Sequence, residues 1–192
     1  MRIAIEARPV GTGLAGNETC GLEPERVTAI PSAAASGLRR ERGRSNLPQL
    51  VLVGKKAGLY GETLKAVEEE GVGDSVVMTG HVSEGDLPAL YTGALCFACQ
   101  SYYEGFGLPP LEAVRCGTAA PTGDRTGLPE SAGNAGLLAD TFDTGALRCA
   151  LARLIEDAPL RAVPGARGLQ RASAFDWRDT ARMTLQVYRR VV

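Results

Sequence analysis

From residue 47 onward, short apolar runs alternate with amphipathic segments. Residues 49–54 (QLVLVG), 75–80 (SVVMTG) and 94–99 (ALCFAC) are almost continuously apolar, which is typical of strands buried in a parallel sheet. Two shorter runs, TAAP at 118–121 and GLLAD at 136–140, read as further strands. The spacing predicts helices over residues 59–71, 83–93, 144–157 and 176–192.

Within these helices the pattern makes three local predictions. In the 59–71 helix, Leu64 and Val67 are expected to face the core of the protein. Ser83 and Asp86 have the spacing of a capping box at the next helix start. The Arg-rich helical stretch that follows residue 157 is expected to be broken at Pro164 and Gly165.

Strands that alternate with helices at these lengths predict an α/β fold, a Rossmann-like doubly wound parallel sheet.

The beginning of the chain is less regular. Residues 2–6 (RIAIE) predict a strand through the alternation of Ile3 and Ile5, and RVTAIP at 26–31 is a second strand candidate. Residues 33–43 (AAASGLRRERG) predict only a weak helix that ends at Gly43. We therefore expect the regular α/β domain at 47–192 and place residues 1–46 outside it.

Length, net charge and the lengths of the apolar runs exclude several classes of function. At 192 residues the chain can form one large domain, or one domain with a remnant of another. A net charge of −1 gives no basic surplus for binding DNA or RNA, so no nucleic-acid partner is expected. No apolar run reaches the roughly 18 residues that span a bilayer. The first residues, MRIAIEARPVG, do not form a signal peptide because Glu6 interrupts a short apolar stretch.

The five cysteines are odd in number and scattered, which argues against a secreted disulfide framework and fits a reducing cytoplasm. Cys96 and Cys99 form a CxxC, but no second CxxC is present and the single histidine, His81, is not at a zinc-finger spacing. Both cysteines lie in an apolar run, where cysteine acts as a small hydrophobe. We expect neither a metal nor a redox centre there.

The stretch EGFGLPPLE, Glu104 to Glu112, carries the chemistry. It follows a predicted strand and leads into a helix, and ligands of open α/β sheets bind at the carboxyl ends of strands. Gly105 and Gly107 allow backbone N–H groups to approach a ligand. A helix beginning near Pro109 adds donors and a partial positive charge, which together predict a phosphate site.

The two carboxylates complete a ligand outline. Glu112 lies near the helix start and can accept hydrogen bonds from the two hydroxyls of a ribose, while Glu104 can accept from a sugar. A phosphate with a hydroxylated ring on either side describes a nucleotide sugar. A glycosidase also uses two carboxylates but gives no reason for the glycine loop. A dehydrogenase fits poorly, because GTGLAG at 11–16 is a loose GxGxxG without a convincing following helix.

These motifs resemble the signature of retaining GT-B glycosyltransferases of the family 4 type. The residues that carry the resemblance are EGFGLPPLE, PQLVLVGKKAGLYGE, VVMTGHVSEGDLPALYTGA, GLPES and FDWRDTARMTLQVYR, in the family's order. They cover residues 47–192 and are similar to the carboxyl-terminal, donor-binding domain. MRIAIEARPVG is similar to the first strand of the family's amino-terminal domain, and LEPERVTAIPS at 22–32 resembles the linker between the two domains. The resemblance thus implies that residues 1–46 are a vestigial remnant of the amino-terminal domain and linker.

The resemblance implies specific roles. Glu104 would contact the hydroxyls of the donor sugar and act as the catalytic residue, and Glu112 would bind the ribose. The backbone at 105–108 would face the sugar and diphosphate, and His81 and Val82 would lie beside the base. Lys55 and Lys56, which follow a strand, would supply positive charge. The donor-binding residues implied in this way are Gly105, Phe106, Gly107, Leu108, Glu112, His81, Val82, Lys55 and Lys56.

The function implied is hexosyl transfer with retention, from a nucleotide sugar to a glycan or glycolipid. Mannose from GDP-mannose is the first expectation, no metal or other cofactor is expected, and peripheral membrane contact is compatible with the resemblance. An alternative is a truncated, catalytically inert module that binds a nucleotide sugar or a partner. Two features favour it: most of the acceptor-binding domain is absent, and so is the strand expected after residue 31 with its basic loop. We expect the absent strand to leave an open sheet edge that promotes self-association.

Overall fold

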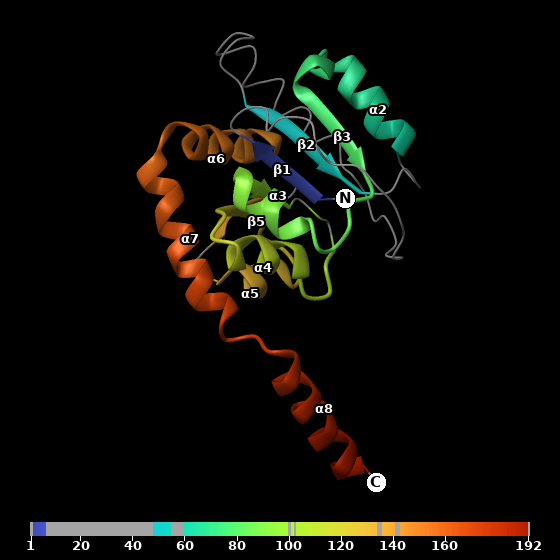
Figure 1. Cartoon of the computed structure of the whole chain (residues 1–192), viewed down its shortest axis with the longest axis vertical. Coiled ribbons are helices and arrows are strands. Elements are labelled where there is room, and N and C mark those ends of the chain that lie inside the picture. The colour runs from blue at the N-terminus through green and yellow to red at the C-terminus, as the bar shows by residue number, and fades with distance from the viewer. Residues whose placement is uncertain are drawn as a thin grey trace.

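The structure is a computed structural model that describes residues 2–6, 48–54, 60–99, 101, 103–133, 136–140 and 143–191. A central sheet is covered by helices, and the last helix projects from this body (Figure 1). The strand expected at 26–31, the weak helix expected at 33–43, and Lys55 and Lys56 lie outside the described residues.

The strands predicted from the apolar runs form a largely parallel sheet. Strand β2 pairs in parallel with β3, and β5 pairs in parallel with β6. Two parallel bridges, Cys96 with Ala119 and Cys99 with Thr122, join the β4 region to the β5 region. The bounds are β2 Gln49–Val53, β3 Val76–Gly80, β4 Ala94–Ala98, β5 Ala120–Gly123 and β6 Gly136–Ala139.

Strand β1 (Arg2–Glu6) lies inside this sheet and runs antiparallel to both of its neighbours. The order is β3-β2-β1-β4, with Ile3 opposite Leu52 on one side and Ala98 on the other. In the described sheet, β2 and β4 are therefore not open edges, and the strands paired on one side only are β3 and β6. The amino-terminal strand, which resembles part of another domain, occupies the position between β2 and β4 and satisfies their backbone groups there.

The described helices lie close to their predicted positions, with two corrections. Leu64 is 44% exposed, whereas Thr63 and Ala66 are buried beside Val67, so the helix turns a small-residue face inward. The predicted break at Pro164 is wrong, because α7 runs without interruption. The bounds are α2 Tyr60–Glu69, η2 Gly73–Ser75 (a 3₁₀ turn), α3 Leu87–Gly93, α4 Leu108–Arg115, α5 Leu128–Ala132, α6 Thr144–Glu156, α7 Ala158–Ala172 and α8 Trp177–Val191.

The capping box predicted before α3 does not form. Asp86 is the residue before the helix, but its side chain makes no capping bond to the backbone. Its carboxylate Oδ2 instead accepts a hydrogen bond of 2.8 Å from the hydroxyl of Ser83. Pro88, at the second helical position, has no N–H to offer a cap.

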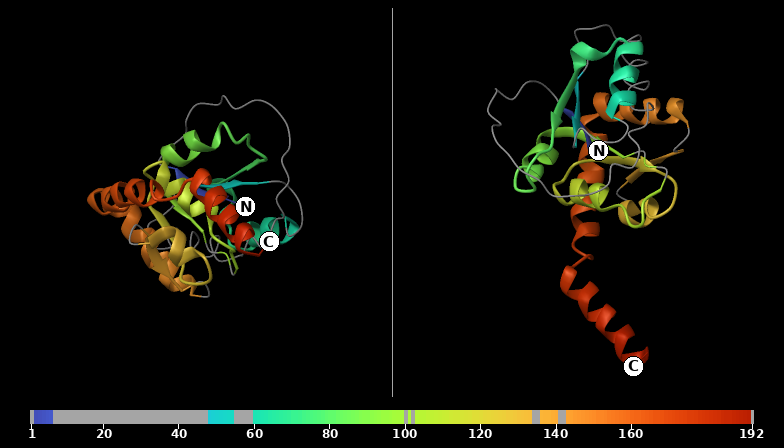
Figure 2. Two further views of the ribbon diagram at one scale, coloured as in Figure 1. Left: turned by 90° about the horizontal axis from the view of Figure 1, so that it is seen from below. Right: turned by 90° about the vertical axis from the view of Figure 1, so that its right-hand side faces the viewer.

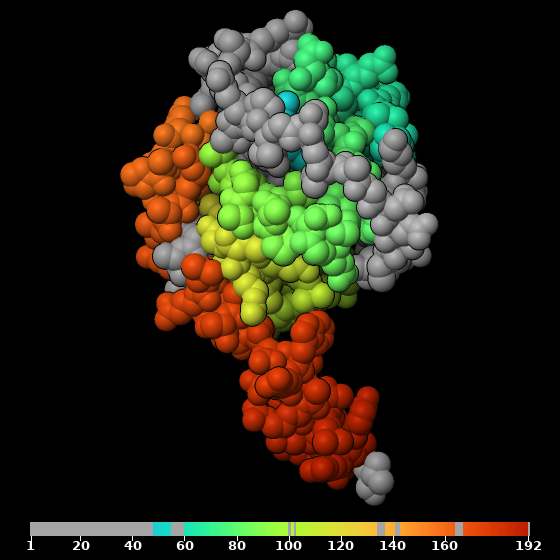
Figure 3. All heavy atoms as spheres, viewed as in Figure 1, coloured from blue at the N-terminus to red at the C-terminus, as the bar shows by residue number. Residues whose placement is uncertain are grey.

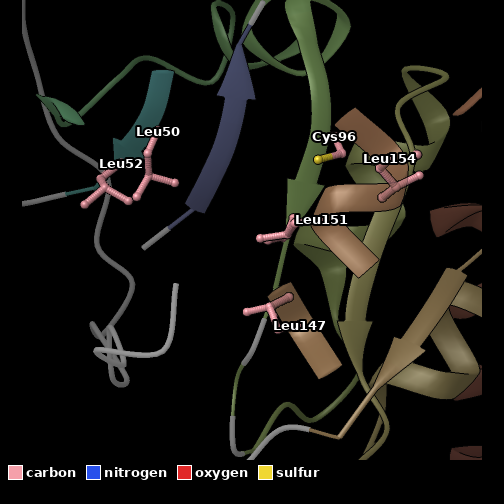
Figure 4. Close-up of a cluster of buried hydrophobic side chains, with 8 residues drawn as sticks. Leu50, Leu52, Cys96, Leu147, Leu151 and Leu154 are labelled. Atoms are coloured by element: carbon pink, nitrogen blue, oxygen red, sulfur yellow. The ribbon is translucent and has the colours of Figure 1, made fainter. Parts of the chain in front are cut away.

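Helices cover both faces of the sheet, which confirms the doubly wound α/β prediction (Figure 2). Alternate residues of β4 point to opposite faces. Cys96 belongs to a cluster with Leu50 and with Leu147, Leu151 and Leu154 of α6 (Figure 4). Phe97 belongs to the cluster on the other face, with residues of α3, α4 and α7.

Helix α8 extends away from this body. Every described residue from Trp177 to Val191 is exposed, and Figure 3 shows the helix as a separate projection. Its apolar side chains include Trp177, Leu185 and Tyr188, which are 75%, 48% and 61% exposed. None of the buried core residues lies in α8, so the fold of the body does not depend on it. Across the described residues, no helix combines the length and the apolar character that a membrane crossing requires.

Candidate functional site

The candidate residues follow the carboxyl ends of parallel strands. Because β2 to β5 run in the same direction, the segments after them open at one edge of the sheet. The segments after β2 and β3 are joined there, since the N–H of Gly54 donates to the carbonyl of Gly80 at 2.8 Å. His81 follows directly and is exposed. This edge is where a ligand of an open α/β sheet binds.

The loop after β4 holds Glu104 in a defined position. The hydroxyl of Ser101 donates to Glu104 Oε1 at 2.9 Å. The carboxylate is half-buried and is part of a loop that ends at the start of α4. Ser101 therefore restrains one oxygen of the carboxylate that the sequence singled out.

A second loop, after β5, is fastened to the first. The N–H of Glu104 donates to the hydroxyl of Thr126 at 3.0 Å, and the N–H of Gly127 donates to the carbonyl of Glu104 at 3.1 Å. A Cβ atom at Gly127 would lie 2.7 Å from the Gly105 carbonyl oxygen, so a side chain there would push the loops apart. Thr126 has a φ of 56°, a strained conformation for a β-branched residue. The two loops form one preorganised unit.

Gly107 joins this unit to α4. Its φ of 88° lies in the left-handed region, and it is the residue that immediately precedes the helix. A Cβ atom would also lie 2.7 Å from Ser131 Oγ and 3.1 Å from Leu128 Cδ2, both in α5. Glycine is thus required for the turn and for the close approach of α5.

The first turn of α4 presents fewer backbone donors than an ordinary helix start. Pro109 and Pro110 have no N–H group, and the N–H of Leu111 points to the carbonyl of Gly107 at 3.4 Å. The potential donors that a ligand can meet are therefore those of the loop and of Leu108. If an anion binds here, its backbone donors are expected from residues 105–108 rather than from the first turn of α4.

The side chain of Phe106 anchors the loop through an aromatic contact. Its ring packs edge-to-face on Phe175, with the centroids 5.2 Å apart. The guanidinium of Arg171 lies over the ring of Phe175, 4.7 Å from its centroid, and also donates a hydrogen bond to the carbonyl of Glu130. This packing holds Phe106 by its side chain, as expected if its backbone serves the site.

Glu112 is half-buried in α4 and is contacted from α3. The phenol of Tyr91 donates to Glu112 Oε2 at 3.0 Å. Tyr91 itself is 4% exposed, and its carbonyl accepts a hydrogen bond of 2.5 Å from Thr118 Oγ1. The carboxylate is therefore held by a buried hydroxyl.

The site residues predicted from the sequence divide into three groups. The structure brings Glu104, the segment 105–108 and Glu112 together on one loop and helix. Val82 packs against the core cluster of Val51 and Val53, so its side chain serves the fold. His81 is exposed at the same sheet edge, and Lys55 and Lys56 lie outside the described residues.

The two cysteines of the CxxC carry protonated thiols, which makes them poor nucleophiles. Burial raises the pKa of the Cys96 thiol to about 12. Burial, and then the nearby carboxylate of Glu104, raise the pKa of Cys99 to about 12. Both thiols are neutral at pH 7, whereas metal ligation and nucleophilic attack require the thiolate. Across the described residues, no group of three or more His, Cys, Asp or Glu side chains could hold a metal ion.

Sequence reasoning missed the residues that support the site. Tyr91 reads from the pattern as an ordinary apolar position of an amphipathic helix. Ser101 and Thr126 are polar residues in segments without periodicity, and no sequence signal shows that their hydroxyls meet Glu104. Gly127 lies in the GLPES stretch, which marks the resemblance but does not reveal which loop it contacts.

Comparison with known proteins bears on this geometry. The family model of glycosyl transferases group 1 matches residues 33–171. An O-antigen chain mannosyltransferase B from Escherichia coli is 41% identical over 110 residues, covering 57% of this chain and 29% of that protein. A D-inositol 3-phosphate glycosyltransferase from Salinispora tropica is 41% identical over 177 residues, covering 87% and 36%.

Solved structures agree. Sucrose-phosphate synthase from Thermosynechococcus elongatus superimposes with a TM-score of 0.70 at 29% identity, covering 85% of this chain and 42% of that one. The chain thus spans less than half the length of these proteins. The family match extends from before β2 almost to the end of α7 and includes both loops of the candidate site. This chain belongs to the glycosyl transferases group 1, and its described residues have the α/β fold of the carboxyl-terminal domain of that GT-B family.

Proposed function

We propose that the loop and helix from Glu104 to Glu112 bind a nucleotide-activated hexose. The chain is then the donor-binding part of a retaining hexosyltransferase. The observation that carries this proposal is the fastened loop: two carboxylates flank a glycine segment whose shape is held by Thr126, Gly127 and α5. Such a segment offers backbone N–H groups to a diphosphate without the cost of ordering it on binding.

In this proposal each part of the site has one task. Glu112 accepts hydrogen bonds from the ribose, and Glu104 accepts from the hydroxyls of the sugar. The N–H groups at 105–108 face the diphosphate, where negative charge grows as the sugar departs. Fixed donors aimed at developing charge are a principal means of catalysis. His81 lies beside the base, and Lys55 and Lys56 add positive charge.

We further propose mannose, carried by GDP, as the donor sugar, with a glycan or glycolipid as acceptor. The support is the name of the O-antigen relative, which is a mannosyltransferase and shares 41% identity over the matched residues. The match covers 29% of that relative, so the choice of acceptor is proposed from the family resemblance and not from this comparison.

Calorimetric titration with GDP-mannose and UDP-glucose tests the proposal. We expect GDP-mannose to bind and Glu112→Ala to weaken it at least about tenfold, the scale of lost hydrogen bonds to a charged acceptor. Glu62→Ala, an exposed glutamate in the first turn of α2, is the matched control and should bind as the wild type does. If neither donor binds at millimolar concentration, the proposal is refuted.

A second candidate function is a donor-binding or interaction module that performs no transfer by itself. The described residues form a single α/β body, whereas transfer needs a second wall that orients the acceptor and excludes water. Turnover of GDP-mannose with a mannosylated acceptor, measured on this chain alone, separates the two. Donor binding without turnover supports the module.

A further inference from the structure

We propose that Tyr91 is a positioning residue of the donor site: its phenol holds the Glu112 carboxylate in the orientation that recognises the ribose hydroxyls. The inference rests on the proposed function, because it assigns Tyr91 a role through Glu112. Tyr91 itself touches no ligand in this account.

The phenol is well placed for this task because its ring is fixed. Tyr91 is 4% exposed and packs edge-to-face on Phe97, with centroids 5.2 Å apart and an interplanar angle of 87°. At the other end of the residue, the Thr118 hydroxyl donates to the Tyr91 carbonyl at 2.5 Å. The buried ring is therefore more restricted than the half-buried side chain of Glu112, and the hydrogen bond orients the carboxylate toward the phenol.

The hydrogen bond itself joins two separate elements. Tyr91 lies in α3 and Glu112 in α4, and the phenol donates to Glu112 Oε2 at 3.0 Å. A glutamate has several rotatable bonds and loses rotamer freedom when it grips a ligand. A carboxylate oxygen has two lone pairs, so acceptance from Tyr91 leaves capacity for further donors. The phenol thus preorganises the carboxylate without using it up.

This arrangement makes a specific prediction about which part of the ligand Tyr91 affects. If the phenol acts through Glu112, its loss weakens recognition of the ribose hydroxyls alone. If Tyr91 only supports the core, its loss weakens every ligand equally. GDP and 2′,3′-dideoxy-GDP differ in those hydroxyls and therefore separate the two roles.

The experiment measures the dissociation constants of both nucleotides for wild type, Tyr91→Phe and Tyr188→Phe. Phenylalanine keeps the buried ring, and Tyr188 is the matched control because its side chain is exposed in α8. We expect Tyr91→Phe to weaken GDP roughly three- to tenfold, the scale of one hydrogen bond, and to leave dideoxy-GDP unchanged. Tyr188→Phe should change neither.

Equal weakening of both nucleotides, or no weakening of GDP, would overturn the positioning role while leaving the proposed function intact. If wild type binds no GDP, or binds both nucleotides equally, the proposed function fails and the inference with it. Should Tyr91→Phe not fold, 3-fluorotyrosine in the wild-type chain provides the test. Its ¹⁹F resonance at position 91 should move when GDP binds and remain still in Glu112→Ala; a resonance that GDP leaves unmoved in the wild-type chain would contradict the inference.

Discussion

At the scale of single residues, the candidate site depends on a few positions where the residue type is set by the local geometry. Gly107 combines a left-handed backbone with close contact to α5. Glu104 and Glu112 each accept a hydrogen bond from a hydroxyl, of Ser101 and Tyr91 respectively. The glycine fixes the path of the loop, and the hydroxyls fix the carboxylates that the loop presents.

Gly107→Ala should destabilise the fold and weaken donor binding together. The left-handed conformation costs about 1–2 kcal/mol for a residue with a Cβ, and contact with Ser131 at 2.7 Å adds to it. We therefore expect a loss of about 2–4 kcal/mol in the free energy of unfolding, measured by urea denaturation. Gly61→Ala is the control: no atom lies within 4 Å of its Cβ, and the change should be neutral or stabilising by up to about 1 kcal/mol. Equal stability of the two variants would contradict the close packing.

The cysteines should differ sharply in reactivity. With a pKa of about 12, Cys96 and Cys99 are ionised in roughly one molecule in ten thousand at pH 8, since a raised pKa favours the neutral thiol below it. Cys149 is exposed in α6. Iodoacetamide labelling followed by mass spectrometry should modify Cys149 within minutes and leave Cys96 and Cys99 unmodified in the folded protein. Rapid labelling of Cys96 would show that β4 is not buried as described.

At the scale of elements, the apolar runs predicted β2 to β6 because a strand covered on both faces needs nearly every side chain to be apolar. The continuity of α7 was not predictable in the same way. Proline disfavours a helix interior, but α7 is held by packing on α4, and tertiary contacts override local propensity. The place of β1 was also hidden, since alternation of Ile3 and Ile5 predicts a strand without naming its neighbours.

The contact between α4 and α7 supplies a test of this packing. Gly168 lies in α7, where a Cβ atom would come 2.5 Å from the Val114 Cβ and 3.0 Å from the Val114 carbonyl oxygen. Alanine in a helix interior normally gains about 1 kcal/mol over glycine. Here we expect Gly168→Ala to lose about 1–3 kcal/mol instead, because overpacking outweighs propensity. Urea denaturation measures the sign, and stabilisation would show that the two helices are farther apart.

At the scale of the whole molecule, the place of the candidate site in the fold was predictable from the sequence, whereas the contacts that hold it were not. The alternation of strands and helices places EGFGLPPLE at the carboxyl edge of a parallel sheet, and the residues Glu104 and Glu112 follow from that position. The contacts of Thr126 and Gly127 with Glu104 join segments that are distant in sequence. A single sequence has no local pattern that records such contacts.

The projecting helix should contribute little to the stability of the body. All described residues of α8 are exposed, so removal of residues 177–192 should change the free energy of unfolding by less than about 0.5 kcal/mol. The same truncation should reduce binding of a hydrophobic dye, because exposed apolar side chains such as Trp177, Val187 and Val191 are removed. A loss of several kcal/mol would instead mean that α8 packs against the body in solution.

The central claim is that a diphosphate binds at the backbone of residues 105–108. The most direct test is an ¹⁵N-correlated NMR titration of the folded chain with GDP, with guanosine as the ligand that lacks phosphates. We predict that GDP shifts the amide resonances of Gly105, Phe106, Gly107 and Leu108 strongly, and that guanosine shifts them weakly or not at all. If GDP leaves these four amides unmoved while it binds elsewhere, or if it shifts no resonance at millimolar concentration, the donor site assigned to this loop is wrong.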